Sequence, residues 1–243
     1  MIQYYKIAGL IVQMDTFGRN LEQAKPYLTA EGKPDIVIQT NPVDMQKIES
    51  HLSLEDCEYI LSGWEFYRKL IAFDGFMLHS SAVVVDGRAY LFSATSGTGK
   101  STHTSLWLKK FGDKAYILND DKPALRLENG VWYAYGTPWS GKYDISTNTR
   151  IPVAGICFIT RSKTNKIYPF NGSKAVFAFL EQTVRPADMQ SRTTIMNLLQ
   201  EMMSGVPIWK LECNMEPEAA DVAYDAMSRK VIEPWRETYE ENR

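Results

Sequence analysis

The alternation of apolar and polar residues divides the N-terminal part of the chain into short segments. Residues 6–14 alternate loosely and residues 35–39 form an apolar run after a Lys-Pro pair, which predicts a strand at each place. Residues 20–27 have the pattern of a short helix, whereas residues 44–68 are polar and aromatic. Residues 1–75 are therefore predicted to form a small α+β N-terminal module without recognisable chemistry.

Two hairpins are predicted farther along the chain. Residues 81–85 lead through Asp-Gly to residues 88–93, and residues 124–127 lead around Asn-Gly to residues 131–135. Both dipeptides suit the two-residue turns that match the twist of paired strands. The strand that ends at residue 93 is therefore expected to pair antiparallel with its predecessor.

The remaining segments complete the prediction of an α/β fold. Strands are predicted at 115–118, 155–160, 166–170 and 208–212, and helices at 102–111, 173–183, 187–204 and 217–228. We expect residues 166–170 to pair with residues 155–160. Residues 76–243 should thus form a mixed-sheet domain behind the N-terminal module, and the charged residues after position 233 should fray.

An aromatic cluster precedes the boundary between these two units. Trp64, Phe66 and Tyr67 lie close together in the sequence, and we expect them to pack against the next unit rather than to stack on a ligand. No Pro-, Gly- or Ser-rich linker separates the units near residues 74–75.

Composition excludes several classes of function. The 243 residues carry 27 basic and 29 acidic side chains, a net charge of -2, so neither nucleic acid nor a membrane is expected as a partner. The three cysteines form no C-x-x-C pair, and the three histidines do not cluster with them, which argues against zinc and against disulfides. No signal or membrane-spanning pattern is present, and we expect a soluble, cytoplasmic protein.

Residues 94–101, Ala-Thr-Ser-Gly-Thr-Gly-Lys-Ser, lie between a predicted strand and a predicted helix. In a phosphate-binding loop, glycines let backbone N–H groups surround phosphate oxygens, a lysine reaches the β and γ phosphates, and a hydroxyl binds Mg²⁺. The first glycine of that pattern is Ala94 here. The alternative is a Gly-rich turn with a surface lysine, but the flanking strand and helix favour nucleotide binding. The predicted cofactor-binding residues are Ser96, Gly97, Thr98, Gly99, Lys100, Ser101 and Thr102.

A second polar segment, Asn119–Asp120–Asp121–Lys122–Pro123, begins 19 positions after Lys100. Alone it is typical of a solvated turn. If the strand before it neighbours the strand before the loop, however, Asp120 and Asp121 end beside the γ-phosphate, where carboxylates hold Mg²⁺ or accept a hydroxyl proton. His79 precedes the first hairpin, and a single histidine is more often structural than catalytic.

These segments together resemble the HPr kinase/phosphorylase family, whose catalytic domain shares a P-loop fold with phosphoenolpyruvate carboxykinases. The resemblance covers about residues 77–135: Leu-His-Ser-Ser-Ala at 78–82, the hairpin, the loop at 96–101 and Asn-Asp-Asp at 119–121. It implies a mixed-sheet P-loop domain of the HPr kinase/PEP carboxykinase type, with ATP and Mg²⁺ as cofactors.

The resemblance also implies roles for individual residues. Lys100 and Ser101 bind phosphate and Mg²⁺, Asp120 is the general base toward a serine hydroxyl, and Asp121 contacts His79 and shares the metal with Ser101. The Gly-Arg-Asn motif of HPr kinases survives only in the Arg-Pro pair at Arg185, and their later acidic metal ligand has no clear counterpart. Transfer from ATP is still expected, but these departures weigh against the phosphorylase reaction and an HPr substrate.

Residues 137–142, Thr-Pro-Trp-Ser-Gly-Lys, are the candidate substrate loop because they offer a lysine, a flexible glycine and an aromatic wall. Trp139, Ser140 and Lys142, with Arg185, are the predicted substrate residues. The alternative is a structural turn anchored by a buried Trp139.

The resulting hypothesis is an ATP- and Mg²⁺-dependent kinase whose acceptor is a serine hydroxyl of a small protein, a peptide or free serine. Lys100, Asp120 and His79 are its predicted catalytic residues. A catalytically silent ATP-binding regulator is the main alternative, and a simple NTPase is a third. Many relatives of HPr kinase assemble as oligomers, so a homo-oligomer is a further expectation.

Overall fold

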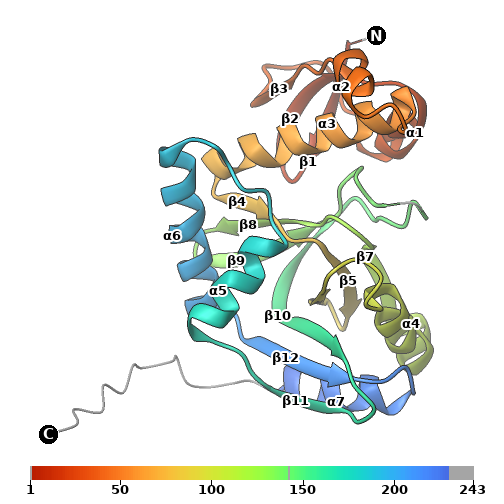
Figure 1. The fold of residues 1–243 in the computed structure, drawn as a ribbon, viewed down its shortest axis with the longest axis vertical. Helices are drawn as coiled ribbons and strands as arrows, with labels where there is room; N and C mark the ends of the chain where they lie inside the picture. Colours follow the sequence, from red (N-terminus) through yellow and green to blue (C-terminus); the bar gives the residue numbers. More distant parts are fainter. Residues whose placement is uncertain (1, 142, 230–243) are drawn as a thin grey trace, which may run out of the picture.

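The computed structural model describes residues 2–141 and 143–229 and shows a mixed α/β fold (Figure 1). Its N-terminal part contains a three-stranded sheet with the order β1-β2-β3. The elements of this part are β1 (Ile2–Ile7), β2 (Leu10–Asp15), α1 (Gly18–Ala24), β3 (Ile36–Ile38), α2 (Pro42–Ile48) and α3 (Leu54–Leu70). Short 3-10 turns at Lys25–Tyr27 and Ile71–Phe73 follow α1 and α3.

The first strand prediction was wrong in one respect, because residues 6–14 contain the turn of a hairpin. Strands β1 and β2 pair antiparallel, with Ile7 opposite Leu10. Ala8 and Gly9 between them adopt φ angles of 51° and 79°. Alanine seldom takes a positive φ, so the Ala-Gly pair carried no turn signal as clear as Asn-Gly or Asp-Gly.

The large sheet is mixed, with the strand order β4-β8-β9-β10-β6-β5-β7. Strand β12 also pairs with β10, and β11 pairs with β12. Its strands are β4 (Gly75–Met77), β5 (Ser80–Val85), β6 (Arg88–Ser93), β7 (Ala115–Asn119), β8 (Ala124–Glu128), β9 (Val131–Tyr135), β10 (Arg150–Arg161), β11 (Lys166–Pro169) and β12 (Ile208–Cys213). The two predicted hairpins, β5–β6 and β8–β9, are both present and antiparallel.

Four strands end at the same edge of this sheet. Strand β5 lies between β6 and β7 and pairs antiparallel with both. Strands β6 and β7 are therefore not neighbours, but they run in the same direction. Strands β10 and β12 run parallel to β6. The carboxyl ends at Ser93, Asn119, Arg161 and Cys213 therefore point the same way, the side of an α/β sheet where ligands commonly bind.

The predicted pairing of residues 166–170 with residues 155–160 was wrong. Strand β11 pairs antiparallel with β12, and β12 pairs parallel with β10. The chain passes through two helices before it returns as β12. Strand β12, which is more distant in sequence, is therefore the neighbour of β10 in place of β11.

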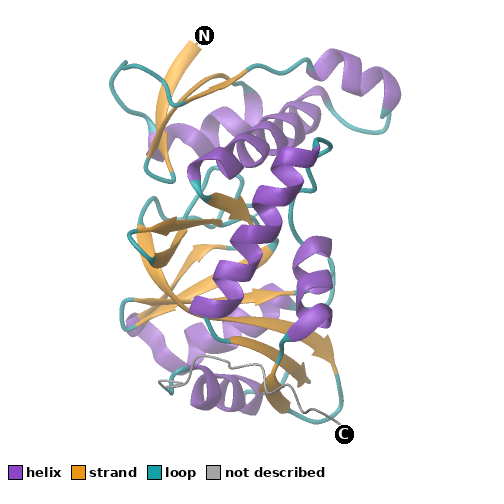
Figure 2. Cartoon of the chain, turned by 90° about the vertical axis from the view of Figure 1, so that its left-hand side faces the viewer, coloured by secondary structure: helices purple, strands orange, loops and turns teal. Residues whose placement is uncertain are grey.

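Helices cover both faces of the sheet (Figure 2). Helix α4 (Lys100–Phe111) and helix α7 (Glu218–Met227) bury Trp107 and Ala223 against Tyr90 and Phe92 of β6. On the other face, helix α5 (Gly172–Glu181) and helix α6 (Met189–Gly205) share a core with β6, β8 and β10. Gly112, with a φ of 54°, ends α4 as expected and begins a short 3-10 turn, Gly112–Lys114.

Helix α3 joins the N-terminal part to the large sheet through aromatic contacts. Phe66 and Tyr67 are buried, and the Phe66 ring stacks on Trp139 with 4.9 Å between centroids. The prediction that the aromatic cluster packs against the next unit is confirmed for these two residues, but Trp64 is 44% exposed. The division of the chain at residue 75 stays a prediction.

Within the described residues, no helix has the length and apolar character needed to cross a membrane.

Candidate active site

The loop between β6 and α4 has the backbone conformation that its glycines permit. Gly97 and Gly99 adopt φ angles of 77° and 120°, and a Cβ at either position would meet no atom within 4 Å. Glycine is therefore needed there for conformation rather than for space. Gly99 caps α4 without a side-chain hydrogen bond, and the first helical bond runs from His103 N to Gly99 O. The N–H groups of the first turn thus face an open anion-binding position.

Lys100 is the first residue of α4, and its side chain folds back over the loop. Its Nζ donates to Ala94 O at 3.2 Å, and the residue is only 8% exposed. Burial lowers the pKa of the ammonium group, although the nearby Asp121 and Asp120 carboxylates oppose this. A positive charge with little solvent around it therefore lies beside the loop.

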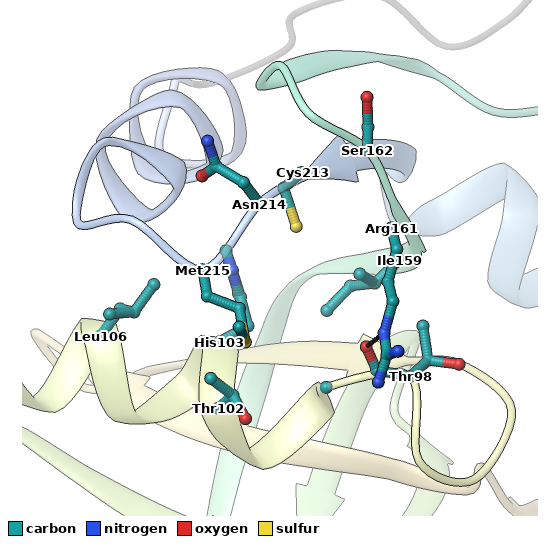
Figure 3. A pocket seen from close by; sticks show the side chains of 11 residues that line it. Thr98, Thr102, His103, Leu106, Ile159, Arg161, Ser162, Cys213, Asn214 and Met215 are labelled. Atoms are coloured by element: carbon teal, nitrogen blue, oxygen red, sulfur yellow. Dashed lines mark hydrogen bonds between the residues drawn. The ribbon is translucent and has the colours of Figure 1, made fainter.

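Arg161, the last residue of β10, braces the loop from outside. Its Nε donates to Thr98 O at 3.0 Å (Figure 3), and its Nη2 donates to Gly97 O. Sequence reasoning missed this arginine, because it lies 60 residues after the loop, in a strand whose end reaches the same sheet edge.

An open cavity of about 390 Å³ lies in front of the loop. It brings together most of the predicted site residues, which come from the loop, the ends of β7 and β4 and the 140–143 segment. Those that line it are His79, Ser96, Gly97, Gly99, Lys100, Ser101, Thr102, Asp120, Asp121 and Ser140. Gly141 and Tyr143, which were not predicted, line it too.

Asp120 and Asp121 reach this cavity because Asn119 fixes the turn after β7. The Asn119 side-chain oxygen accepts from Asp121 N at 2.9 Å and from Lys122 N at 2.7 Å, an Asx-type turn. Asp120 Oδ1 accepts a hydrogen bond from Ser81 Oγ at 2.6 Å. One oxygen of the Asp120 carboxylate is therefore oriented by a hydroxyl.

Asp121 is held by cationic and polar partners. Its Oδ1 lies 3.2 Å from His79 Nε2, and its Oδ2 pairs with Lys122 Nζ. Burial alone would raise the pKa of this carboxyl, but the His79 hydrogen bond and the Lys122 charge outweigh it and lower the pKa to about 2. Asp121 is thus a fixed anion at neutral pH, and the His79 contact implied by the resemblance is present.

His79 is held on its other side by Gln182, which sequence reasoning missed. His79 Nδ1 lies 3.0 Å from Gln182 Oε1, and His79 N donates to Gln182 O at 2.7 Å. Gln182 follows α5, more than 100 residues after His79, and carries no motif of its own. Only the folded chain brings the two together.

The predicted substrate residues are placed differently from one another. Ser140 lines the cavity, and its Oγ donates to Asp144 Oδ1 at 2.9 Å. Trp139 is fully buried, and its Nε1 donates to Ser62 Oγ at 3.2 Å, so its indole lies in the core and not in the cavity wall. Arg185 is exposed and does not line the cavity. Lys142 lies outside the described residues.

Gly141 connects the cavity wall to the N-terminal part. Its carbonyl oxygen accepts from Arg19 Nη2 at 2.6 Å and from Gln23 Nε2 at 3.2 Å, and its N–H donates to Tyr59 Oη at 3.0 Å. A Cβ on Gly141 would lie 2.9 Å from the Asp121 Cβ. Side chains of α1 and α3 therefore set the position of a backbone segment that touches Asp121.

The donor set fits a nucleotide with a phosphate-bound magnesium ion. The described residues contain no group of three or more His, Cys, Asp or Glu side chains that could hold a metal, so the cavity is not a self-sufficient metal site. Mg²⁺ commonly takes one or two protein oxygens and completes its shell with phosphates and water. The Ser101 hydroxyl and the Asp121 carboxylate are oxygens of that kind in this cavity.

Comparison with known proteins includes a match to a family model. The family model described as "SynChlorMet cassette protein ScmC" matches residues 54–219, more than half of the chain. No curated protein matches the sequence. Among solved structures, the Hpr(Ser) kinase/phosphatase from Coxiella burnetii matches with 12% identity and a TM-score of 0.36, over 62% of this chain and 95% of that one. Similarity at that level carries no inference about this chain.

Proposed function

The chain belongs to the SynChlorMet cassette protein ScmC family, and from its site we propose an ATP- and Mg²⁺-dependent kinase that phosphorylates an alcohol, in particular a serine hydroxyl. One observation carries the proposal: Lys100 at the start of α4 and the Asp120–Asp121 pair after β7 line the same cavity. A cation for the phosphates and a carboxylate for the acceptor are the two parts that phosphoryl transfer requires.

In this proposal the loop holds the triphosphate. The N–H groups at the start of α4 and the Lys100 ammonium bind the phosphate oxygens and stabilise the charge that spreads over them during transfer. Mg²⁺, held by Ser101 and Asp121, would neutralise charge on the phosphates. His79 and Lys122 keep Asp121 anionic and fixed in place.

Asp120 acts on the acceptor. Its carboxylate takes the proton of the serine hydroxyl while the oxygen forms a bond to the γ-phosphorus, and the bond from that phosphorus to ADP breaks. The Ser81 hydroxyl donates to Asp120 Oδ1 and leaves the second carboxylate oxygen for the acceptor. The acceptor is a serine of a small protein, a peptide or free serine, approaching past Ser140 and Gly141.

The test is transfer of label from γ-labelled ATP with Mg²⁺. The purified protein is incubated alone and with free serine, an HPr protein and a panel of serine-containing peptides, and Lys100→Ala is the control. Label on an acceptor with the wild type and none with Lys100→Ala supports the kinase. Release of labelled phosphate without any acceptor would instead identify an NTPase.

A catalytically silent ATP-binding regulator is the second candidate. It is favoured by Ala94, which stands where the phosphate-binding loop pattern has its first glycine. ATP binding with neither transfer nor hydrolysis would support the regulator and contradict the kinase for the acceptors tested.

A further inference from the structure

A second cavity, of about 290 Å³, lies beside α4 (Figure 3). It is enclosed by the first two turns of α4, the end of β10 and the segment that follows β12. Gly99 and Thr102 line this cavity and also the cavity in front of the loop. The two cavities therefore meet at the start of α4, where the proposed function puts the phosphates.

The walls of the second cavity are mainly apolar. Leu106, Ile159 and Cys213 are each less than 10% exposed, whereas Met215, which also lines the cavity, is 72% exposed. Ser162 also belongs to the lining, but its Oγ points away from the other labelled side chains (Figure 3) and accepts a hydrogen bond from Thr164 N at 3.3 Å. A flat, uncharged ring packs well between aliphatic and sulfur-containing side chains.

Two titratable groups of the walls, His103 and Cys213, carry no charge at neutral pH. Burial lowers the pKa of His103 to about 4 and raises the pKa of the Cys213 thiol to about 11. The Arg161 guanidinium also lines the cavity, but it donates to the carbonyl groups of Thr98 and Gly97. A charged ligand would gain little electrostatic stabilisation from these walls, and a neutral ligand needs none.

The second cavity extends far enough from the loop to hold the base of a nucleotide whose phosphates bind at the loop. Gly99 and Leu106, both in its lining, are seven residues apart along α4, which corresponds to roughly 10 Å of helix. A volume of about 290 Å³ is at the lower limit of small-molecule pockets, so it holds one ring system rather than a whole nucleotide. The phosphates then remain outside, at the loop.

We propose that this second cavity receives the nucleobase of the nucleotide whose triphosphate binds the loop, with Leu106, Ile159 and Met215 around the ring. This inference rests on the proposed function. It adds a base-binding site next to the phosphate-binding residues, with which it shares Gly99 and Thr102, and it places part of the nucleotide affinity in the segment after β12.

The experiment compares two ligands that share a triphosphate. Calorimetric titration with Mg²⁺ measures the binding of ATP and of inorganic tripolyphosphate, which lacks the base and the ribose. Met215→Ala and Leu106→Ala each remove one apolar side chain from the lining. Met189→Ala is the matched control, because Met189 is 74% exposed in α6 and does not line the cavity. Circular dichroism verifies the fold of each variant.

We expect Met215→Ala and Leu106→Ala each to weaken ATP binding roughly fivefold through lost apolar contact. Tripolyphosphate binding should be unchanged in both variants, and Met189→Ala should match the wild type with both ligands. Equal effects on ATP and tripolyphosphate, or none on either, would overturn the base site. Lys100→Ala should weaken both ligands; a wild type that binds neither would overturn the proposed function, and the base site with it.

Discussion

At the scale of residues, the two adjacent aspartates meet different partners. Asp121 is paired with Lys122 and contacts His79, whereas Asp120 accepts a hydrogen bond from the Ser81 hydroxyl. A carboxylate paired with a cation loses part of its basicity, and Asp121 is such a carboxylate, with a pKa lowered to about 2. In the proposed kinase, proton transfer therefore belongs to Asp120, and Asp121 is the anion that orders the site.

Asp120→Asn should therefore lower phosphoryl transfer by about 10²- to 10⁴-fold, the range for loss of a general base. ATP affinity should remain within about twofold, because the loop and Lys100 hold the triphosphate. Transfer assays and nucleotide titration measure the two effects separately. Asp113→Asn, in the exposed turn after α4, is the matched control. Unchanged transfer by Asp120→Asn would rule out its role as the base.

His103 makes the stability of the protein depend on pH. It is 3% exposed, its Nε2 accepts a hydrogen bond from Trp107 Nε1 at 3.2 Å, and burial lowers its pKa from 6.5 to about 4. Protonation of Nε2 would break that bond and bury a charge. The stabilisation is therefore complete above pH 6.5 and is lost as the pH falls toward 4, because only the unfolded chain binds the proton in that range.

The free energy of unfolding should accordingly fall by about 3 kcal/mol between pH 7 and pH 4 from this residue. Urea unfolding at a series of pH values measures the slope, and His103→Gln should remove it. His51, whose side chain is 74% exposed, supplies the control: His51→Gln should leave the slope in place. A His103→Gln slope equal to that of the wild type would contradict the assignment.

At the scale of elements, local signals predicted what is local. The Asp-Gly and Asn-Gly pairs predicted both hairpins of the large sheet. Gly97, Gly99 and Lys100 predicted the loop before α4. Contacts between distant parts of the sequence were not predictable. Three such contacts each join segments more than 40 residues apart. Strand β12 pairs with β10, Gln182 contacts His79, and Arg19 donates a hydrogen bond to Gly141 O.

A substitution at Gly141 tests whether the contact between the loop after β9 and Asp121 matters for phosphoryl transfer. Alanine at this position should cost about 1 kcal/mol for its φ of 77°. It should also lower phosphoryl transfer, because the new Cβ would displace Asp121, whose Cβ is 2.9 Å away. Urea unfolding and the transfer assay measure these two effects.

Gly130→Ala is the matched control, since Gly130 has the same φ of 77° but no atom within 4 Å of its Cβ position. It should lose a similar amount of stability and keep full transfer. If both variants retained full transfer, the contact between Gly141 and Asp121 would have no role in the reaction.

At the scale of the whole molecule, the N-terminal part and the large sheet share a core. Met77, Ala124, Tyr135 and Trp139 of the sheet side form one buried cluster with residues of β1, β2 and α3. Arg126 of β8 also donates to Ala8 O at 2.8 Å. Large apolar side chains contribute roughly 1.5–3 kcal/mol each when buried, and a folded domain is stable by only about 5–15 kcal/mol.

A chain that begins at Gly75 should therefore not fold stably, even though residue 75 was the predicted boundary between the two units. Removal of residues 1–74 exposes Trp139 and Tyr135 and leaves Gly141 without Arg19, Gln23 and Tyr59. Circular dichroism, tryptophan fluorescence and urea unfolding of the 75–243 fragment should show no cooperative transition. The full-length Arg19→Ala variant should unfold cooperatively and keep its ATP affinity, while its transfer falls. A fragment that folds cooperatively and binds ATP like the full chain would establish two independent domains and would make the shared core dispensable.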